Sequence, residues 1–308
     1  MDFFLTLQNV SVLFLLILIG YIVGRLGIVS EGGQRELTAL ILNVTMPATI
    51  ILSMQVPFTM EKLNQAIWLS LIMIGCYLFM VLFSSLAVRL FPKLSAGRVD
   101  ILQAGMILSN TSFMGYPIVL ALLGEGALFY AVICGSFIFE IFAWTYGTYL
   151  IGRNAGGGGV SLKRAVLNPG VLSIGVGVIL FLTGLTIPEP INSTMELLSK
   201  ATSPMAMMMV GMILSRTKLS EALGDRNIYI ASGFKLLVHP LLILFALRAL
   251  GFSDVFITVP IILLSMPTAA YVAMFSASLD NDEAYAGQLV FVSSLLSLIT
   301  IPIVTSLL

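Results

Sequence analysis

SNTSFMGYP, residues 109–117, interrupts an otherwise apolar helical run with a polar cluster and a proline. SMPTAAY, residues 265–271, interrupts a second apolar run about half a chain later. An unwound helix exposes N–H and C=O groups that hydrocarbon cannot satisfy, so such backbone is expected only where it lines a cavity or binds a ligand. Together the two stretches predict a pair of broken helices that form a site deep within the molecule.

Composition places these runs in a membrane. The chain has 308 residues, of which 58% are hydrophobic and 10% charged, and its mean hydropathy is +1.06. A soluble domain carries roughly 25% charged residues, so the composition predicts an all-α polytopic membrane protein. The formal net charge of zero gives no reason to expect a nucleic-acid partner.

Motifs for catalysis or metal binding are missing from the sequence. The single histidine excludes a zinc site built from several His ligands. The sequence has no His-Glu-x-x-His motif and no paired intramembrane aspartates, so we predict no enzyme activity, no metal site and no cofactor beyond a coupling ion.

Apolar runs long enough to cross a bilayer, about 20 residues each, predict ten helices. Their expected ranges are 3–24, 35–54, 66–91, 101–123, 127–152, 168–187, 194–215, 227–250, 256–278 and 284–307. The predicted organisation is a first repeat (1–152), a Gly-rich cytoplasmic connector (153–165) and a second repeat (166–308).

The two halves carry matching landmarks. Asn43–Pro47 aligns with Lys200–Pro204, and Ile107–Ser109 aligns with Leu263–Ser265 at nearly the same shift. With five helices in each half, the second repeat must cross the membrane in the opposite sense, which predicts a five-plus-five inverted repeat. The broken helices are then the fourth and the ninth.

Basic residues predict the orientation, because Lys and Arg favour cytoplasmic loops. Most of them follow the odd-numbered helices: Arg25, Arg35, Arg89, Lys93, Arg98, Arg153, Lys163, Arg164, Arg216, Lys218 and Arg226. The opposite side holds only Lys62, Lys200 and Arg248. We therefore expect a multi-pass protein of the cell membrane with both termini outside.

The first break supplies the main candidate site residues. Asn110, Thr111 and Ser112 can cap the half-helix that follows, whose amino end carries partial positive charge and suits a carboxylate. The alternative is a proline kink closed by neighbouring hydroxyls without a ligand. The other candidates at the two breaks are Pro117, Pro267 and Thr268.

Two charged residues lie within apolar spans. Glu140 is near the middle of the fifth helix, where a carboxylate is costly unless it is paired or protonated. Lys235 lies about a third of the way into the eighth. Either could couple transport to an ion or balance charge. Alternatively, they could pair with each other, Glu140 could face a water-filled crevice, or Lys235 could extend to the membrane surface.

Asn43 and Thr45 on the second helix, with Pro47, match Thr202 and Pro204 on the seventh. They could face the site from its other wall. Equally, they could only bend the helices where the two halves meet.

The motif Leu42–Pro47, the stretch Leu264–Ala270 and the C-terminal Leu295–Pro302 resemble the auxin efflux carrier family over nearly the whole chain. The chain is also distantly similar to the bile acid sodium symporter fold. The resemblance implies that helices 4 and 9 cross at their breaks. It further implies a scaffold of helices 1, 2, 6 and 7 and a moving unit of helices 3–5 and 8–10. The short connector is similar to that of compact bacterial members.

The function implied is secondary transport of a small organic anion, auxin-like or a dicarboxylate such as malate, by an elevator-like step. Expected partners are the anion, the lipid bilayer and a second copy bound through the scaffold. The coupling ion is Na+, H+ or neither. Alternatives are a sodium-coupled symporter of the bile-acid type, a channel and a ligand sensor that does not transport.

Overall fold

The computed structural model describes residues 3–155, 167, 169–216 and 223–308. Residues 156–165, most of the expected connector, lie outside the described part, as do the loop cations Lys163, Arg164 and Lys218. The described residues form helices and no strand.

The α-helices are α1 (Phe3–Arg25), α2 (Glu31–Leu40), α3 (Met46–Ser53), α4 (Met60–Ala87), α5 (Ala96–Ile107), α6 (Tyr116–Leu123), α7 (Glu125–Tyr130), α8 (Ile138–Phe142), α9 (Thr148–Gly152), α11 (Pro169–Thr183), α12 (Glu189–Ser215), α14 (Arg226–Gly233), α15 (His239–Ala249), α16 (Asp254–Leu264), α17 (Tyr271–Ser278) and α18 (Glu283–Ser306). The π-helical turns are η1 (Ile41–Thr45), η3 (Thr111–Gly115), η4 (Ala131–Phe137), η5 (Ala143–Gly147) and η6 (Phe234–Val238), and η2 (Val88–Leu90) is a 3₁₀ turn.

Six continuous helical stretches within the described residues are long and apolar enough to cross a bilayer. They are Glu31–Ser53, Met60–Leu90, Glu125–Gly152, Glu189–Ser215, Arg226–Ala249 and Glu283–Ser306. Shorter apolar helices are Ser11–Arg25, Thr111–Leu123, Pro169–Thr183 and Asp254–Leu264. The chain is therefore an all-α protein with several membrane-spanning helices.

Two long helices begin earlier than the apolar runs predicted. The third predicted span starts at 66, but α4 starts at Met60 because Thr59 accepts a hydrogen bond from the backbone N–H of Lys62 and caps the helix. The seventh was expected from 194, but α12 starts at Glu189, with Pro190 in its first turn, where proline is well tolerated. Polar first turns thus extend both helices beyond their apolar segments.

α1 and α12 approach each other backbone to backbone. An added Cβ on Gly20 would lie 2.0 Å from the carbonyl oxygen of Met208, and one on Gly211 would lie 1.9 Å from that of Ile17. Small residues allow this close packing between membrane helices. α3 packs against both α11 and α12, so the first, second, sixth and seventh predicted helices form one contact group, here called the scaffold helices.

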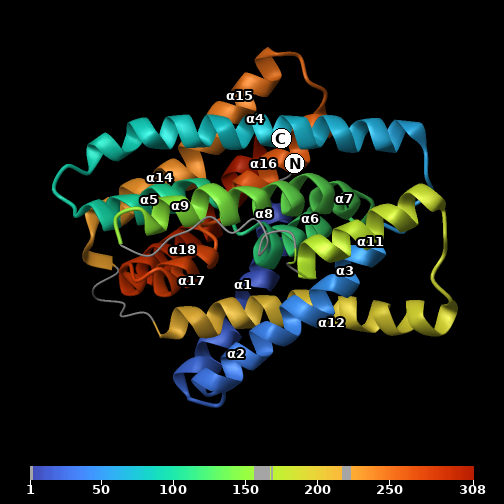
Figure 1. Ribbon diagram of the computed structural model, residues 1–308, viewed down its shortest axis with the longest axis horizontal. Coiled ribbons are helices and arrows are strands. Elements are labelled where there is room, and N and C mark those ends of the chain that lie inside the picture. The colour runs from blue at the N-terminus through green and yellow to red at the C-terminus, as the bar shows by residue number, and fades with distance from the viewer. Residues whose placement is uncertain (1–2, 156–166, 168, 217–222) are drawn as a thin grey trace.

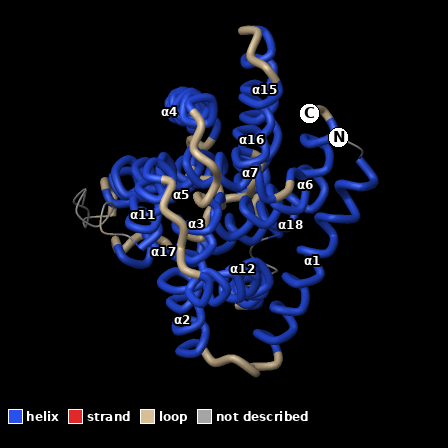
Figure 2. The backbone as a smooth tube through the Cα atoms, turned by 90° about the vertical axis from the view of Figure 1, so that its right-hand side faces the viewer, coloured by secondary structure: helices blue, strands red, loops and turns tan. Residues whose placement is uncertain are grey.

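The remaining helices lie on the other side of the molecule. Figures 1 and 2 show α4 and α12 at opposite sides, with α5 and α6 between them. α5, α14 and α17 all contact α18. The two broken helices therefore lie in the interior, between the scaffold helices and α4.

Three π-helical turns precede a proline at the same spacing. η1 is followed by Pro47, η3 by Pro117 and η6 by Pro240, each two residues after the turn ends. Proline lacks an N–H and its ring collides with the carbonyl four residues earlier, so a widened turn relieves the conflict. Each of these prolines therefore follows a widened turn in its helix.

Candidate functional site

Both predicted breaks are present. α5 ends at Ile107, and helical structure resumes with η3 at Thr111. α16 ends at Leu264, and α17 begins at Tyr271. Each break divides its helix into two half-helices.

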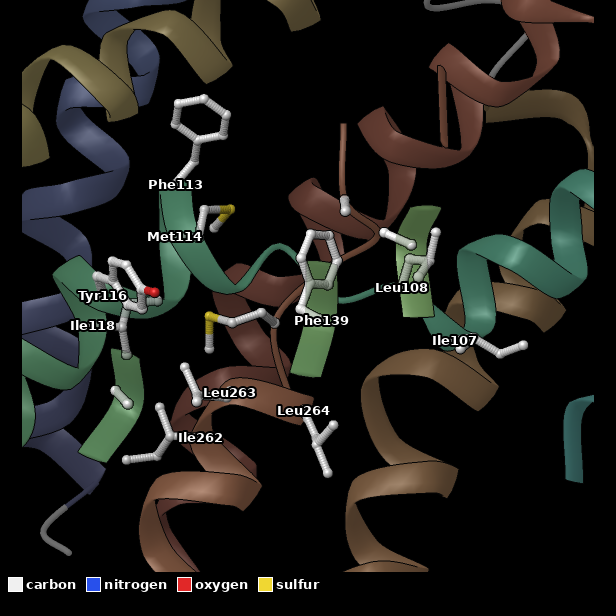
Figure 3. Packing of buried hydrophobic residues seen from close by; sticks show 14 of the residues in the cluster. Ile107, Leu108, Phe113, Met114, Tyr116, Ile118, Phe139, Ile262, Leu263 and Leu264 are labelled. Atoms are coloured by element: carbon white, nitrogen blue, oxygen red, sulfur yellow. The ribbon is translucent and has the colours of Figure 1, made fainter. Parts of the chain in front are cut away.

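The two breaks cross and bond to each other as a short antiparallel pair. The N–H of Asn110 donates to the carbonyl of Pro267 at 2.8 Å, and the N–H of Ala269 donates to that of Leu108 at 2.9 Å. Figure 3 shows apolar side chains, including Leu108, Phe139 and Leu264, around this crossing. Each break therefore satisfies backbone groups that the other exposes.

Side chains of the second break are committed to this structure. The hydroxyl of Thr268 donates to the carbonyl of Gly105 at 3.0 Å, and its N–H donates to Ser293 Oγ at 3.2 Å. The Ser265 hydroxyl donates to the carbonyl of Ile261 at 2.6 Å. Pro267 and Thr268 are thus structural members of the crossing.

Side chains of the first break remain available. The buried Asn110 amide makes no hydrogen bond with the described residues, and the fully buried Thr111 hydroxyl has no partner among them. Ser112 Oγ lies 3.5 Å from Ser136 Oγ. Unsatisfied buried polar atoms are rare in native proteins, so the unpartnered Thr111 hydroxyl marks this break as a candidate ligand site.

The predicted side-chain capping at this break is wrong. No side chain caps η3; instead the backbone carbonyl of Asn110 accepts from the N–H of Gly115 at 3.0 Å. Among the described residues, the N–H groups of Ser112 and Phe113 make no backbone hydrogen bond to an acceptor outside this helix. The amino end of this half-helix therefore keeps open donors that favour an anion.

A small cavity of about 20 Å³ adjoins this amino end, large enough for about one water-sized group. Its walls come from both sides of the molecule: Leu42, Met46, Ile50 and Gly170 from the scaffold helices, and Ser112, Phe113, Ser136, Glu140 and Tyr271 from the helices around the crossing. The cavity lies where the two sets of helices meet. Pro117 is buried in α6, two residues beyond η3.

Glu140 places a carboxylate on the wall of this cavity. Its side chain is 6% exposed. Tyr271 OH donates to Glu140 Oε1 at 2.9 Å, and Trp144 Nε1 donates to Oε2 at 2.9 Å. Because Tyr271 is the first residue of α17, this hydrogen bond connects Glu140 with the second broken helix.

Lys235 reaches the other side of the crossing. It is fully buried in η6, which excludes the predicted alternative of extension to the membrane surface. Its ammonium contacts the Ser109 hydroxyl and the Leu264 carbonyl, the latter at 3.4 Å. In the described part of the chain its contacts are with these oxygens and not with Glu140.

Asn43 and Thr45 lie in different environments, although both were predicted to face the site. Asn43 is exposed and donates to the carbonyl of Ala39 in its own helix at 2.7 Å, so it is not brought to the crossing. Thr45 is buried, and its hydroxyl has no partner among the described residues. One turn on, Thr49 donates to Thr202 Oγ1 at 2.9 Å. This bond joins the second and seventh predicted helices at their matched motifs.

A larger polar hollow, about 490 Å³, lies open between α2 and α12 on one side and α17 and α18 on the other. Glu31, Arg35, Arg216 and Glu283 contribute charged groups to it, and Arg216 pairs with Glu31 at 2.5 Å. The hollow separates scaffold helices from crossing helices on the side rich in basic residues.

Sequence reasoning missed Asp100, which is 1% exposed. Its carboxylate accepts hydrogen bonds from Arg153 Nε at 3.0 Å and from Asn154 Nδ2 at 2.6 Å. The hydrogen bond from Arg153 to Asp100 raises the pKa of the Arg153 guanidinium. Asp100 stands at the edge of the apolar run and does not interrupt it, so its position in the sequence does not indicate that it is buried. The interaction joins α5 to the end of α9.

Replacing Asp100 with Asn should lower stability by about 1–3 kcal/mol, because it removes the charge that holds Arg153. Thermal unfolding of the purified protein would measure this. Glu31→Gln is the control, since it breaks an ion pair whose Glu31 side chain is 76% exposed and should cost less than about 1 kcal/mol. Equal losses in both variants would contradict the role given to Asp100.

These features define a polytopic membrane protein with crossed, broken helices and a small cavity beside the crossing. Residues 5–305 match the family described as "Membrane transport protein". The chain belongs to this family, the auxin efflux carriers that its motifs resembled. It is a transport protein family, not an enzyme family.

Its relatives are also described as transporters. The chain is 28% identical over 299 residues to an uncharacterized transporter of Methanothermobacter thermautotrophicus, with 96% of each chain covered. It is 27% identical over 297 residues to an uncharacterized transporter of Methanocaldococcus jannaschii, with 95% of each covered. A Rhizobium meliloti protein named "Putative malonate transporter" is 26% identical over 203 residues, 62% of each chain.

Proposed function

We propose that this protein carries a small carboxylate anion across the membrane, with the first break as its binding site. The observation that carries the proposal is the buried, unpartnered Thr111 hydroxyl at this helix end. It lies beside the buried Asn110 and beside the N–H groups of Ser112 and Phe113, which make no backbone hydrogen bond to a described acceptor outside the helix. Donors fixed at a helix amino end stabilise negative charge without reorganisation. The name of the Rhizobium relative makes malonate the first anion to test, followed by malate and an indole-carboxylate.

The carrier would work by alternating access between two rigid groups of helices. The scaffold helices pack closely through Gly20 and Gly211, whereas an open polar hollow and the small cavity lie between them and the crossing helices. Movement of the crossing helices against the scaffold would open the cavity to either side. We accordingly retain a ten-helix inverted repeat, an elevator-like step, outside termini and a scaffold-mediated homodimer as parts of the proposal.

Glu140 is the proposed coupling group. A carboxylate anion in a low-dielectric cavity beside an ionised Glu140 is strongly disfavoured by like-charge repulsion. Protonation of Glu140 removes this repulsion, so anion and proton would cross together and the empty carrier would return with Glu140 ionised. The Tyr271 hydroxyl, which donates to Glu140 here, can instead accept from the protonated acid.

Asn110→Ala should weaken anion affinity by about tenfold, because one side-chain hydrogen bond to a charged group contributes about 1.5 kcal/mol. Uptake and counterflow of labelled malonate, malate and indole-carboxylate in proteoliposomes would measure it. The exposed Asn64→Ala is the matched control and should transport normally. Unchanged transport by Asn110→Ala removes this residue from the site. Flux without saturation or counterflow indicates a channel, and binding without flux indicates a sensor.

A further inference from the structure

The crossing has a second side, formed by the carboxyl ends of α5 and α16. Both ends meet basic residues that lie one turn apart on the eighth predicted helix. Lys235 Nζ contacts the Leu264 carbonyl at 3.4 Å, and His239 Nδ1 lies 3.2 Å from the Met106 carbonyl. Carboxyl ends of helices carry partial negative charge. The crossing thus has donors open on one side and carbonyls facing basic groups on the other.

Carbonyl oxygens of interrupted helices are ligands that transporters offer to Na+. At this crossing an ammonium already contacts one such carbonyl, that of Leu264, together with the Ser109 hydroxyl. Both Lys235 and Ser109 are fully buried, so no bulk water separates them. The Lys235 ammonium and a small inorganic cation would compete for the same oxygens.

We propose that Lys235 is a built-in substitute for a coupling cation, so that this carrier binds no Na+ at its crossing and needs none for transport. The inference rests on the proposed function, because it concerns the ion that drives the anion. It assigns to the Lys235 ammonium a structural role, in which it links the carboxyl end of α16 at Leu264 to Ser109 in the first break. A proton on Glu140 then remains as the coupling ion.

The test uses two Lys235 variants that differ in the space they leave. Lys235→Ser removes the ammonium and leaves room beside Ser109 Oγ and the Leu264 carbonyl. Lys235→Met fills that room with an apolar chain. Thermal unfolding is measured for each purified protein in NaCl and in N-methyl-D-glucamine chloride at equal ionic strength and pH.

The melting temperature of the wild type should be the same in both salts. We expect Lys235→Ser to melt lower in N-methyl-D-glucamine and to recover by about 3 °C or more in NaCl, corresponding to about 1 kcal/mol. Lys235→Met should melt lower in both. The exposed Lys200→Ser is the control and should not respond to Na+.

Two results would overturn the inference: Na+-dependent stability or anion flux in the wild type, or a Lys235→Ser response to Na+ no larger than that of Lys200→Ser. If neither Lys235 variant can be purified, the wild-type comparison still decides. Because unfolding is measured without substrate, a failure to transport the tested anions would count against the proposed function and leave this result standing.

Discussion

Glu140→Gln should make anion flux independent of pH. In the wild type, flux should rise as pH falls, because only the protonated Glu140 accepts an anion beside it. A requirement for one proton gives a limiting change of about tenfold per pH unit on the alkaline side. The glutamine side chain of the variant is always neutral, so this dependence should disappear. Proteoliposome flux measured at a series of pH values, equal inside and outside, would show it.

Tyr271→Phe is the matched control for this experiment. It removes the hydroxyl that donates to Glu140 Oε1 but keeps the carboxylate and its bond from Trp144. The variant should therefore still show a pH-dependent flux. If Glu140→Gln keeps the wild-type dependence, Glu140 is not the coupling group, and a second titrating group must be sought.

Gly211→Ala should have the largest effect on stability. The new methyl group would lie 1.9 Å from the Ile17 carbonyl oxygen and 2.6 Å from the Tyr21 nitrogen. Both are backbone atoms of α1, so no side-chain rotation can relieve the collision. Forcing the helices apart should cost about 3 kcal/mol or more, measurable as a lower melting temperature and a loss of monodisperse protein.

Gly75→Ala makes the same chemical change in the middle of α4, where an added Cβ meets nothing within 4 Å. Alanine favours helix by up to about 1 kcal/mol over glycine, so this control should be neutral or slightly stabilising. If Gly211→Ala were equally harmless, the close approach of α1 and α12 would not hold the scaffold helices together.

The sequence predicts best those structural features that a few neighbouring residues determine. A proline and a polar cluster within an apolar run predicted both interruptions, because hydrocarbon tolerates no unsatisfied backbone. Each of these signals is contained in a few consecutive residues.

The sequence could not show which polar groups, far apart along the chain, form hydrogen bonds with each other. Asn110 was expected to cap its own half-helix, but its backbone bonds to Pro267, far along the chain. The sequence suggests that Lys235 pairs with Glu140 or extends to the membrane surface. Instead, Lys235 contacts a carbonyl and a hydroxyl oxygen, and no sequence motif predicts these partners. Thr268 and Asn110 looked equivalent as site residues, and only their hydrogen bonds distinguish them.

The reciprocal bonding of the two breaks has a consequence for biogenesis. During synthesis, Leu108 and Asn110 leave the ribosome long before Pro267 and Ala269, the residues that supply their backbone partners. Until the second half arrives, the nascent fourth helix keeps polar backbone that lipid cannot satisfy. We therefore expect insertion of this helix to be completed only after the second break has been translated, and we expect an N-terminal fragment that lacks the second half to be retained by the insertion machinery or degraded.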